Sequence, residues 1–219
     1  MLKMNPQVKG LLTIVRDREQ PRGEFIFYAD RLIRLLIEEG LSYLEFEPTT
    51  VITPAGCAYE GTQLKSRICG VSMVRAGESM EAGLRQVFKK IRIGKILISK
   101  DEDGVPHFLF AKFPQDIGER QVLLLDPMLA TGASVTEAVK VLMQHGVKEE
   151  NILFLNLIAA PQGIKSFTKR FPKIKIVTVE IDKTLSNTGI SLPGIGEFGD
   201  RYFGTEENDS RNSIIENRF

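Results

Sequence analysis

Short apolar runs alternate with stretches of helical periodicity along most of the chain. The apolar runs predict strands at 68–73, 91–99, 122–125, 152–158 and 174–181. Apolar residues at helical spacing predict helices over 25–39 and 80–90, another after Ser134, and another that ends near Phe171. Because the run at 152–158 is apolar almost throughout, we expect a mainly parallel sheet with helices on both faces and right-handed crossovers.

Two segments interrupt this alternation. Residues 46–65 contain Thr53-Pro-Ala-Gly56 and little periodicity, which predicts a loop or a weak hairpin. The turn Asp101-Glu-Asp-Gly104 predicts a hairpin whose second strand is 107–112, and we expect this hairpin to project as an arm. No repeat or linker divides the sequence. We therefore expect a single domain over 1–219, with an N-terminal segment at 1–24 and a polar, mobile tail at 206–219.

Composition constrains the partners more than the fold. The 219 residues suffice for one full core, and the net charge of +1 gives no electrostatic reason to expect nucleic acid or a membrane surface as a partner. The two cysteines form neither a disulfide framework nor a metal-ligand spacing. No apolar stretch has the length of a signal-peptide core or a membrane span, so we expect a cytoplasmic protein.

The strand at 122–125 leads into the segment that is richest in chemistry. Asp126 stands at its carboxyl end, and a turn of small residues through Gly132 leads to the next helix. In α/β proteins this arrangement presents backbone amides to a phosphate, and the acid can accept hydrogen bonds from nearby sugar hydroxyls. Ser134 and Glu137 predict a capping box at the helix start. The alternative is an ordinary strand–turn–helix without a ligand.

Two further loops are expected at the same edge of the sheet. Arg75 follows one strand and offers a planar fork of donors to phosphate oxygens, unless it is a surface arginine in a capped turn. Near the C-terminus, Gly194, Gly196 and Gly199 form a GxGxxG, but too little chain follows them for a dinucleotide-binding unit. A tight loop whose backbone pairs with the edge of a planar base fits better than a loop that only closes the core.

Three segments together resemble the uracil phosphoribosyltransferase family. They are Val74-Arg-Ala-Gly-Glu-Ser-Met80, Leu125-Asp-Pro-Met-Leu-Ala-Thr-Gly-Ala-Ser134 and Pro193-Gly-Ile-Gly-Glu-Phe-Gly-Asp-Arg-Tyr-Phe-Gly-Thr205. The resemblance runs from Leu11 to Thr205. The same segments also resemble the related C-terminal domain of uridine kinase-like proteins. It implies a single-domain type I phosphoribosyltransferase-like fold. It also implies a pentosyltransferase of pyrimidine salvage that converts uracil and phosphoribosyl pyrophosphate to UMP and pyrophosphate.

The resemblance also implies roles for individual residues. Asp126, Arg75 and Glu197 are the implied catalytic residues. The residues implied in binding phosphoribosyl pyrophosphate are Arg75, Lys100, Asp126, Pro127, Met128, Leu129, Ala130, Thr131, Gly132, Ala133, Ser134 and Glu197. Those implied in binding uracil are Ser191, Gly196, Glu197 and Phe198. The implied cofactor is Mg²⁺, held mainly by the pyrophosphate and ribose of the substrate and not by protein side chains alone.

Four positions depart from the pattern of the family. Lys100 stands where an arginine is usual and keeps the charge without the bidentate fork. Ala133 replaces a glycine, Glu197 replaces an aspartate, and Ser191 replaces a larger apolar residue, usually isoleucine. These departures leave two alternatives open: a catalytically degenerate domain that acts as a nucleotide sensor or assembly module, and a transferase for another base. The resemblance further implies a homodimer or homotetramer, with GTP as a candidate effector.

Overall fold

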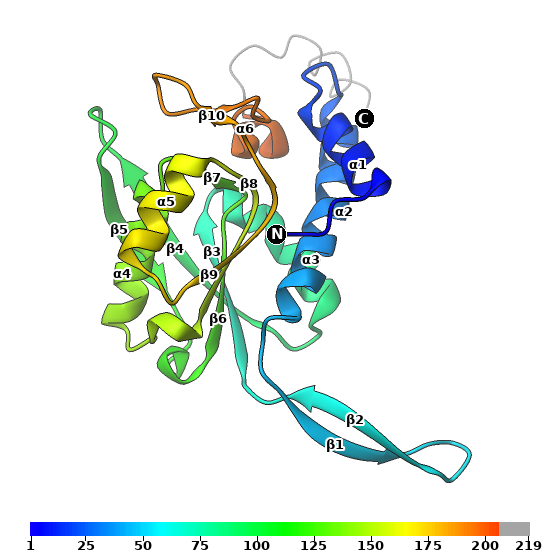
Figure 1. Cartoon of the computed structure of the whole chain (residues 1–219). Coiled ribbons are helices and arrows are strands. Elements are labelled where there is room, and N and C mark those ends of the chain that lie inside the picture. The colour runs from blue at the N-terminus through cyan, green and yellow to red at the C-terminus, as the bar shows by residue number, and fades with distance from the viewer. Residues whose placement is uncertain (206–219) are drawn as a thin grey trace, which may run out of the picture.

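The computed structural model describes residues 1–205, whose central feature is a seven-stranded sheet (Figure 1). Its strands are β3 (Ile68–Val74), β4 (Arg92–Lys100), β5 (Pro106–Lys112), β6 (Gln121–Leu125), β7 (Met128–Leu129), β8 (Ile152–Ala159) and β9 (Lys175–Ile181). The strand order is β5-β4-β3-β6-β8-β7, and β9 also pairs with β8. All of these pairings are parallel except that of β5 with β4. The expected polar tail at 206–219 lies outside the described residues.

Helices cover both faces of this sheet, as the sequence predicted (Figure 1). One face carries α1 (Pro6–Arg16), α2 (Arg22–Leu41) and α3 (Glu81–Val87), and the other carries α4 (Ala133–Gln144) and α5 (Pro161–Arg170). Every residue of β8 is buried, because the sheet is covered on both sides at this strand. The short helical turns are η1 (Ala76–Met80), η2 (Ile117–Glu119), η3 (Glu149–Asn151) and α6 (Phe198–Phe203). The mainly parallel α/β fold is therefore confirmed.

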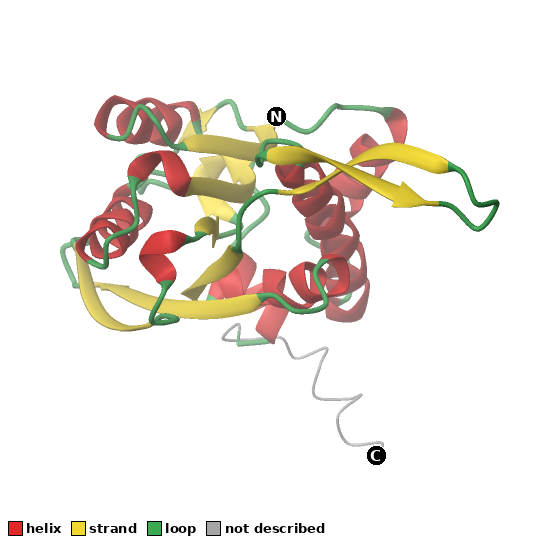
Figure 2. Ribbon diagram, turned by 90° about the horizontal axis from the view of Figure 1, so that it is seen from below, coloured by secondary structure: helices red, strands yellow, loops and turns green. Residues whose placement is uncertain are grey.

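Both hairpins that the sequence indicated are present, but the one that projects as an arm is the weak hairpin within residues 46–65 and not the hairpin around Gly104. The arm consists of β1 (Phe46–Ile52) and β2 (Ala58–Leu64), which pair antiparallel and extend away from the helices (Figures 1 and 2). The hairpin around Gly104 instead runs along the sheet edge, where β5 continues the ladder of β4. The weak hairpin, one of the two alternatives for 46–65, is therefore confirmed, and the expectation that the Gly104 hairpin forms the arm was wrong. Both faces of the arm are largely exposed, so its strands carry no apolar alternation that would have marked them more strongly.

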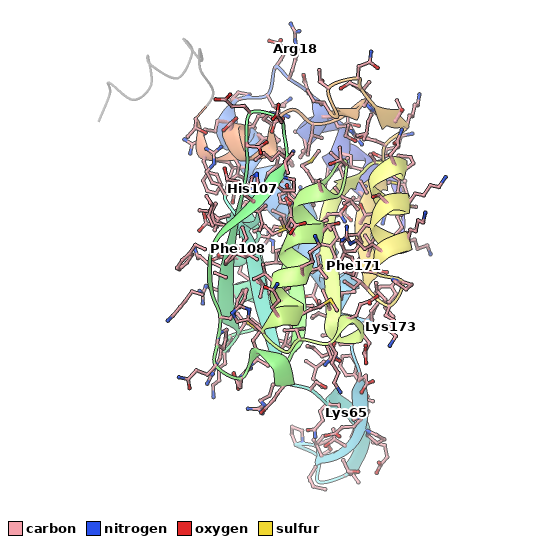
Figure 3. All side chains as sticks on the ribbon, turned by 90° about the vertical axis from the view of Figure 1, so that its left-hand side faces the viewer. Arg18, Lys65, His107, Phe108, Phe171 and Lys173 are labelled. Carbon is pink, nitrogen blue, oxygen red and sulfur yellow. The ribbon has the colours of Figure 1, made fainter. Side chains whose placement is uncertain are left out.

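The carboxyl ends of the parallel strands meet at the end of the molecule opposite this arm. The short hairpin of β10 (Thr184–Leu185) and β11 (Ser191–Leu192) lies at that end together with α6 (Figure 1). In Figure 3, Arg18 marks the same end and Lys65 marks the base of the arm. Among the helices of residues 1–205, none has the length and apolar character needed to cross a membrane.

Helix α5 approaches the chain after β7 so closely that only glycine fits. A Cβ added at Gly163 would lie 2.1 Å from the carbonyl oxygen of Ala130 and 3.1 Å from that of Leu129. Gly10 in α1 is different, since an added Cβ there would meet nothing within 4 Å. The two helical glycines therefore provide a matched pair.

We expect Gly163→Ala to lower the free energy of unfolding by on the order of 1–3 kcal/mol, because the methyl group must displace backbone. Gly10→Ala should instead raise it by about 1 kcal/mol, through the better helix propensity of alanine. Urea unfolding of both variants at equal protein concentration measures the difference. Equal stability of the two variants would contradict the close approach of α5.

Candidate functional site

A cavity of about 280 Å³ lies at the carboxyl edge of the sheet. Its lining comprises Ala76, Lys100, Asp126 and residues 128–135, 188–191 and 196–199. The segments that follow β3 and β6 therefore share one cavity with the last residue of β4 and the glycine-rich segment near the C-terminus. Parallel order explains this convergence, because the loops after neighbouring parallel strands leave the sheet at one edge.

The phosphate loop, residues 126–134, directs a helix N-terminus at this cavity. Gly132 has a φ of +82° and serves as the N-cap of α4 without a side-chain cap bond. The predicted capping box is therefore wrong: the helix begins at Ala133, and Ser134 lies within its first turn. Residues 133–135 line the cavity, so the positive end of the helix faces it, as a phosphate group requires.

The departure at Ala133 is compatible with this loop. The left-handed residue is Gly132, whereas Ala133 is the first residue of a right-handed helix. A second glycine is therefore not needed for the backbone conformation at this position. Thr131 assists the turn, since its Oγ1 accepts a hydrogen bond from the amide of Ala133 at 3.3 Å.

Asp126 is half-buried in the cavity wall, and its environment disfavours its charge. Burial raises the pKa of Asp126 to about 7, while the amide of Met128 and the charge of Lys100 lower it only in part. The amide of Met128 donates to Oδ1 at 3.3 Å. The carboxyl group can thus change protonation near neutral pH, and it is directed at whatever fills the cavity.

Arg75 lies beside the cavity and is held by partners that the sequence analysis did not assign. Its guanidinium donates to the carboxylate of Asp200 and to the hydroxyl of Thr205, and it lies 6.0 Å from the ring centroid of Phe203. The next residue, Ala76, lines the cavity. The side chain of Arg75 is therefore close to the cavity in an ion pair that a stronger anionic ligand could replace.

The glycine loop, residues 193–199, presents backbone to the cavity and aromatic rings to the core. The ring of Phe198 is 1% exposed and packs 5.3 Å from Phe25 and 5.7 Å from Tyr202, measured between centroids. Phe198 therefore contributes backbone, not a stacking face. The hydroxyl of Ser191, which precedes the loop, donates to Asp182 at 2.6 Å.

Two placements differ from what the sequence analysis emphasised. Pro127 is buried away from the cavity lining, and its carbonyl accepts the amides of Leu157 and Ile158 at 2.8 and 3.0 Å. Residues 188–190, in the turn between β10 and β11, line the cavity although no role was assigned to them. Tertiary packing brings this turn to the phosphate loop, where a Cβ added at Gly189 would lie 3.4 Å from the methyl group of Thr131. The local sequence therefore gave little indication that these residues line the cavity.

The cavity has two carboxyl-bearing residues, Asp126 and Glu197. Within residues 1–205, no group of three or more His, Cys, Asp or Glu side chains is placed to hold a metal ion. One or two carboxylates beside substrate phosphates are the usual surroundings of Mg²⁺, so the donors of this cavity fit a metal that arrives with its ligand.

Comparison with known proteins finds matches that span the fold and both loops. A sequence model of the family described as uracil phosphoribosyltransferase matches residues 2–205. The uracil phosphoribosyltransferase of Dictyostelium discoideum is 62% identical over 208 residues, which cover 94% of this chain and 96% of that protein. Uridine kinase-like protein 4 of Arabidopsis thaliana is 53% identical over 201 residues, 92% of this chain and 43% of that protein. The solved structure of the AQ2163 protein from Aquifex aeolicus superposes with a TM-score of 0.84 at 26% identity, covering 95% of this chain and 99% of that one.

The raised pKa of Asp126 predicts a pH-dependent stability cost. The folded protein binds the proton more tightly than the unfolded chain, whose carboxyl has the ordinary value of 3.8. Stability should therefore fall as pH rises from about 4 to about 7, and Asp126→Asn should abolish this fall. Between pH 5 and pH 8 we expect the variant to gain on the order of 1–3 kcal/mol relative to the unsubstituted chain in urea unfolding.

Asp116→Asn is the matched control for this measurement. Its hydrogen bonds with Arg120 lower the pKa of Asp116 to about 2, so its contribution is fully present at both pH values. The loss of stability in Asp116→Asn should be equal at pH 5 and pH 8. A pH-independent difference for Asp126→Asn would show that Asp126 has an ordinary pKa.

Proposed function

The chain belongs to the uracil phosphoribosyltransferase family, and we propose that it transfers the phosphoribosyl group of phosphoribosyl pyrophosphate to uracil, giving UMP and pyrophosphate. The observation that carries this proposal is the single cavity lined by the phosphate loop, Lys100, Asp126 and the glycine loop. A phosphate site, a site for sugar hydroxyls and a loop for a planar base are thereby adjacent. The product UMP assigns the reaction to pyrimidine salvage.

Positioning of the phosphorylated sugar is the first contribution of the protein. We assign the 5-phosphate to the phosphate loop, where the N-terminus of α4 and the turn at Gly132 face the cavity. We assign Asp126 to the ribose hydroxyls, whose hydrogen bonds favour its ionised form. Fixing the sugar between these two groups places its anomeric carbon in line with the base, which lowers the entropic part of the barrier.

Neutralisation of the leaving group is the second contribution. The N1 atom of uracil forms a bond to the anomeric carbon and gives its proton to water, while the bond to pyrophosphate breaks and pyrophosphate takes the electron pair. Lys100 lines the cavity, and Arg75 lies beside it, so we assign both cations to the pyrophosphate oxygens. Asp126 and Glu197 are the carboxylates that would contact a Mg²⁺ ion arriving with the substrate, and the ion when bound would supply further positive charge to the leaving group.

Recognition of the base is assigned to the backbone of the glycine loop. Gly196, with a φ of +75°, and the next residues Glu197 and Phe198 line the cavity. Peptide groups can offer both donors and acceptors to the edge of uracil. Ser191 also lines the cavity, but its hydroxyl hydrogen is already donated to Asp182.

Self-association is a further proposal, supported by exposed apolar side chains away from the cavity. Val51, Ile52 and Tyr59 of the arm are 52%, 71% and 60% exposed. Apolar side chains on a projecting two-stranded arm gain most by packing against another copy of the chain. We propose a homodimer or homotetramer in which the arm makes contacts. A GTP effector and a cytoplasmic location are proposals that rest on the resemblance and on the sequence alone.

Catalysis is tested with labelled uracil, phosphoribosyl pyrophosphate and Mg²⁺, which should yield UMP. Lys100→Met should lower kcat/KM for phosphoribosyl pyrophosphate by on the order of 100-fold, because one cation at the leaving group is lost. Lys89→Met removes an exposed cation outside the cavity lining and should leave kcat/KM unchanged. Binding of UMP by a folded chain that makes no UMP would overturn the proposal in favour of a nucleotide sensor.

Self-association is tested by light scattering of the eluted protein at several concentrations. Ile52→Asp places a charge on the exposed arm and should shift the protein to a smaller species. Met143→Asp alters an exposed apolar residue of α4, which is 43% exposed, and should leave the assembly unchanged. An unsubstituted chain that elutes as a monomer at all concentrations would refute the oligomer.

A further inference from the structure

The glycine loop is held from behind by a buried ion pair that the proposed reaction does not use. Asp182 follows β9, and its side chain is 0% exposed. Arg16, the last residue of α1, donates from Nη2 to Oδ1 of Asp182 at 2.7 Å. Its guanidinium also donates to Oε2 of Glu180 at 2.7 Å, on the more exposed side of the pair.

Both groups of this pair bond the same residue of the glycine loop, Gly194, one at its amide and the other at its carbonyl. The amide of Gly194 donates to Oδ2 of Asp182 at 3.1 Å, and the carbonyl of Gly194 accepts from Nη1 of Arg16 at 2.7 Å. The hydroxyl of Ser191 adds a third donor to Asp182, at 2.6 Å. A buried carboxylate with three donors and a guanidinium in a planar fork fix this segment in position and in orientation.

A second arginine holds the next carbonyl of the loop. Arg201 donates from Nη1 to the carbonyl oxygens of Ile195 at 2.7 Å and of Val15 at 2.8 Å. Its guanidinium carbon lies 4.0 Å from the ring centroid of Phe25. The carbonyls of Gly194 and Ile195 are thus bonded to arginines, whereas Gly196 to Gly199 are the part of the loop that lines the cavity.

We propose that Arg16 and Asp182 are positioning residues that set the base-binding geometry of the glycine loop without touching the substrate. The proposal rests on the assignment of this loop to the base. The pair holds Ser191 and Gly194, which come just before the cavity-lining part of the loop. It thereby determines where the peptide groups of residues 196–198 meet the base. Its effect therefore falls on the base and not on the phosphorylated sugar.

Substitution of either residue should weaken binding of the base selectively. Asp182→Asn keeps the shape but offers only one oxygen, so an amide group must face either Arg16 or the donors of Ser191 and Gly194. Arg16→Lys keeps the charge but cannot bond Gly194 and Asp182 with one planar fork. Each variant should raise the Kd of UMP by on the order of tenfold, as expected for one disrupted buried hydrogen-bond set.

The test is calorimetric titration of the full chain with UMP and, separately, with Mg²⁺ and phosphoribosyl pyrophosphate, which carries no base. Asp182→Asn and Arg16→Lys, together called the clamp variants, should lose UMP affinity. Their affinity for phosphoribosyl pyrophosphate should stay within about twofold of its original value. In turnover, the KM of uracil should rise and the KM of phosphoribosyl pyrophosphate should not. A merely structural role would weaken both ligands alike.

Each variant has a matched control. Arg18→Lys makes the same change at a side chain that is 91% exposed, and Glu180→Gln alters the exposed partner of Arg16; neither should shift UMP affinity measurably. Arg16→Lys preserves a cation opposite Asp182 and carries the test if Asp182→Asn does not fold. Unchanged UMP affinity in a folded clamp variant, or equal losses for both ligands, would overturn the proposal. Failure of the unsubstituted chain to bind UMP would instead overturn the proposed function.

Discussion

Parallel pairing of β3, β6 and β8 is the constraint on which the cavity depends. Leu125 at the end of β6 is in register with Ser72 of β3 and with Leu155 of β8, so the carboxyl ends of all three strands lie at one edge of the sheet, where β3 runs two residues and β8 four residues further than β6. Their loops must therefore leave the sheet together. A Cβ added at Gly77 would lie 2.2 Å from the carbonyl oxygen of Leu125, which shows how closely the loop after β3 packs on the end of β6.

Two aspartates at this edge illustrate how environment divides ligand binding from positioning. Asp182 is surrounded by Arg16, Ser191 and Gly194, so its charge is compensated within the protein. Asp126 accepts one hydrogen bond from a backbone amide and feels the charge of Lys100, but the effect of burial on its pKa is larger than both. The compensated carboxylate is suited to holding a loop. The uncompensated one lowers the stability of the folded protein and is available to a ligand, which is the usual arrangement at functional sites.

The sequence allowed prediction of the elements whose periodicity reflects burial. The buried strand at 152–158 and the apolar face of the helix at 25–39 were predicted because one physical cause, exclusion from water, controls every residue in them. The arm could not be located in this way, since its side chains are largely exposed on both faces. The helix at 6–16 was also missed, although Asn5 caps it by accepting the amide of Val8 at 2.9 Å.

The predicted loops of the site are brought together, but their supports are long-range and were not predictable. Asp126 and the glycine loop could be found because each follows a recognisable local pattern. Arg16 and Asp182 are 166 positions apart, and neither has a local sequence pattern that distinguishes it from the other charged residues of the chain. The start of α4 was mistaken by two residues because the positive φ of Gly132 supplies the helix start that Ser134 seemed to provide.

The N-terminal segment consequently supports the site, although it is distant from the glycine loop in sequence and does not line the cavity. The C-terminal end of α1 supplies Arg16 and the carbonyl of Val15, and the carbonyl of Asp17 accepts from Nη2 of Arg201 at 2.8 Å. These bonds connect the end of α1 to α6 and to the glycine loop. Because a loop with two left-handed glycines has little conformational preference of its own, its geometry must be imposed by such contacts. The arm lies at the opposite end of the described fold from the cavity (Figure 1), so the contacts between copies that we propose for the arm would leave the chemistry of the cavity undisturbed.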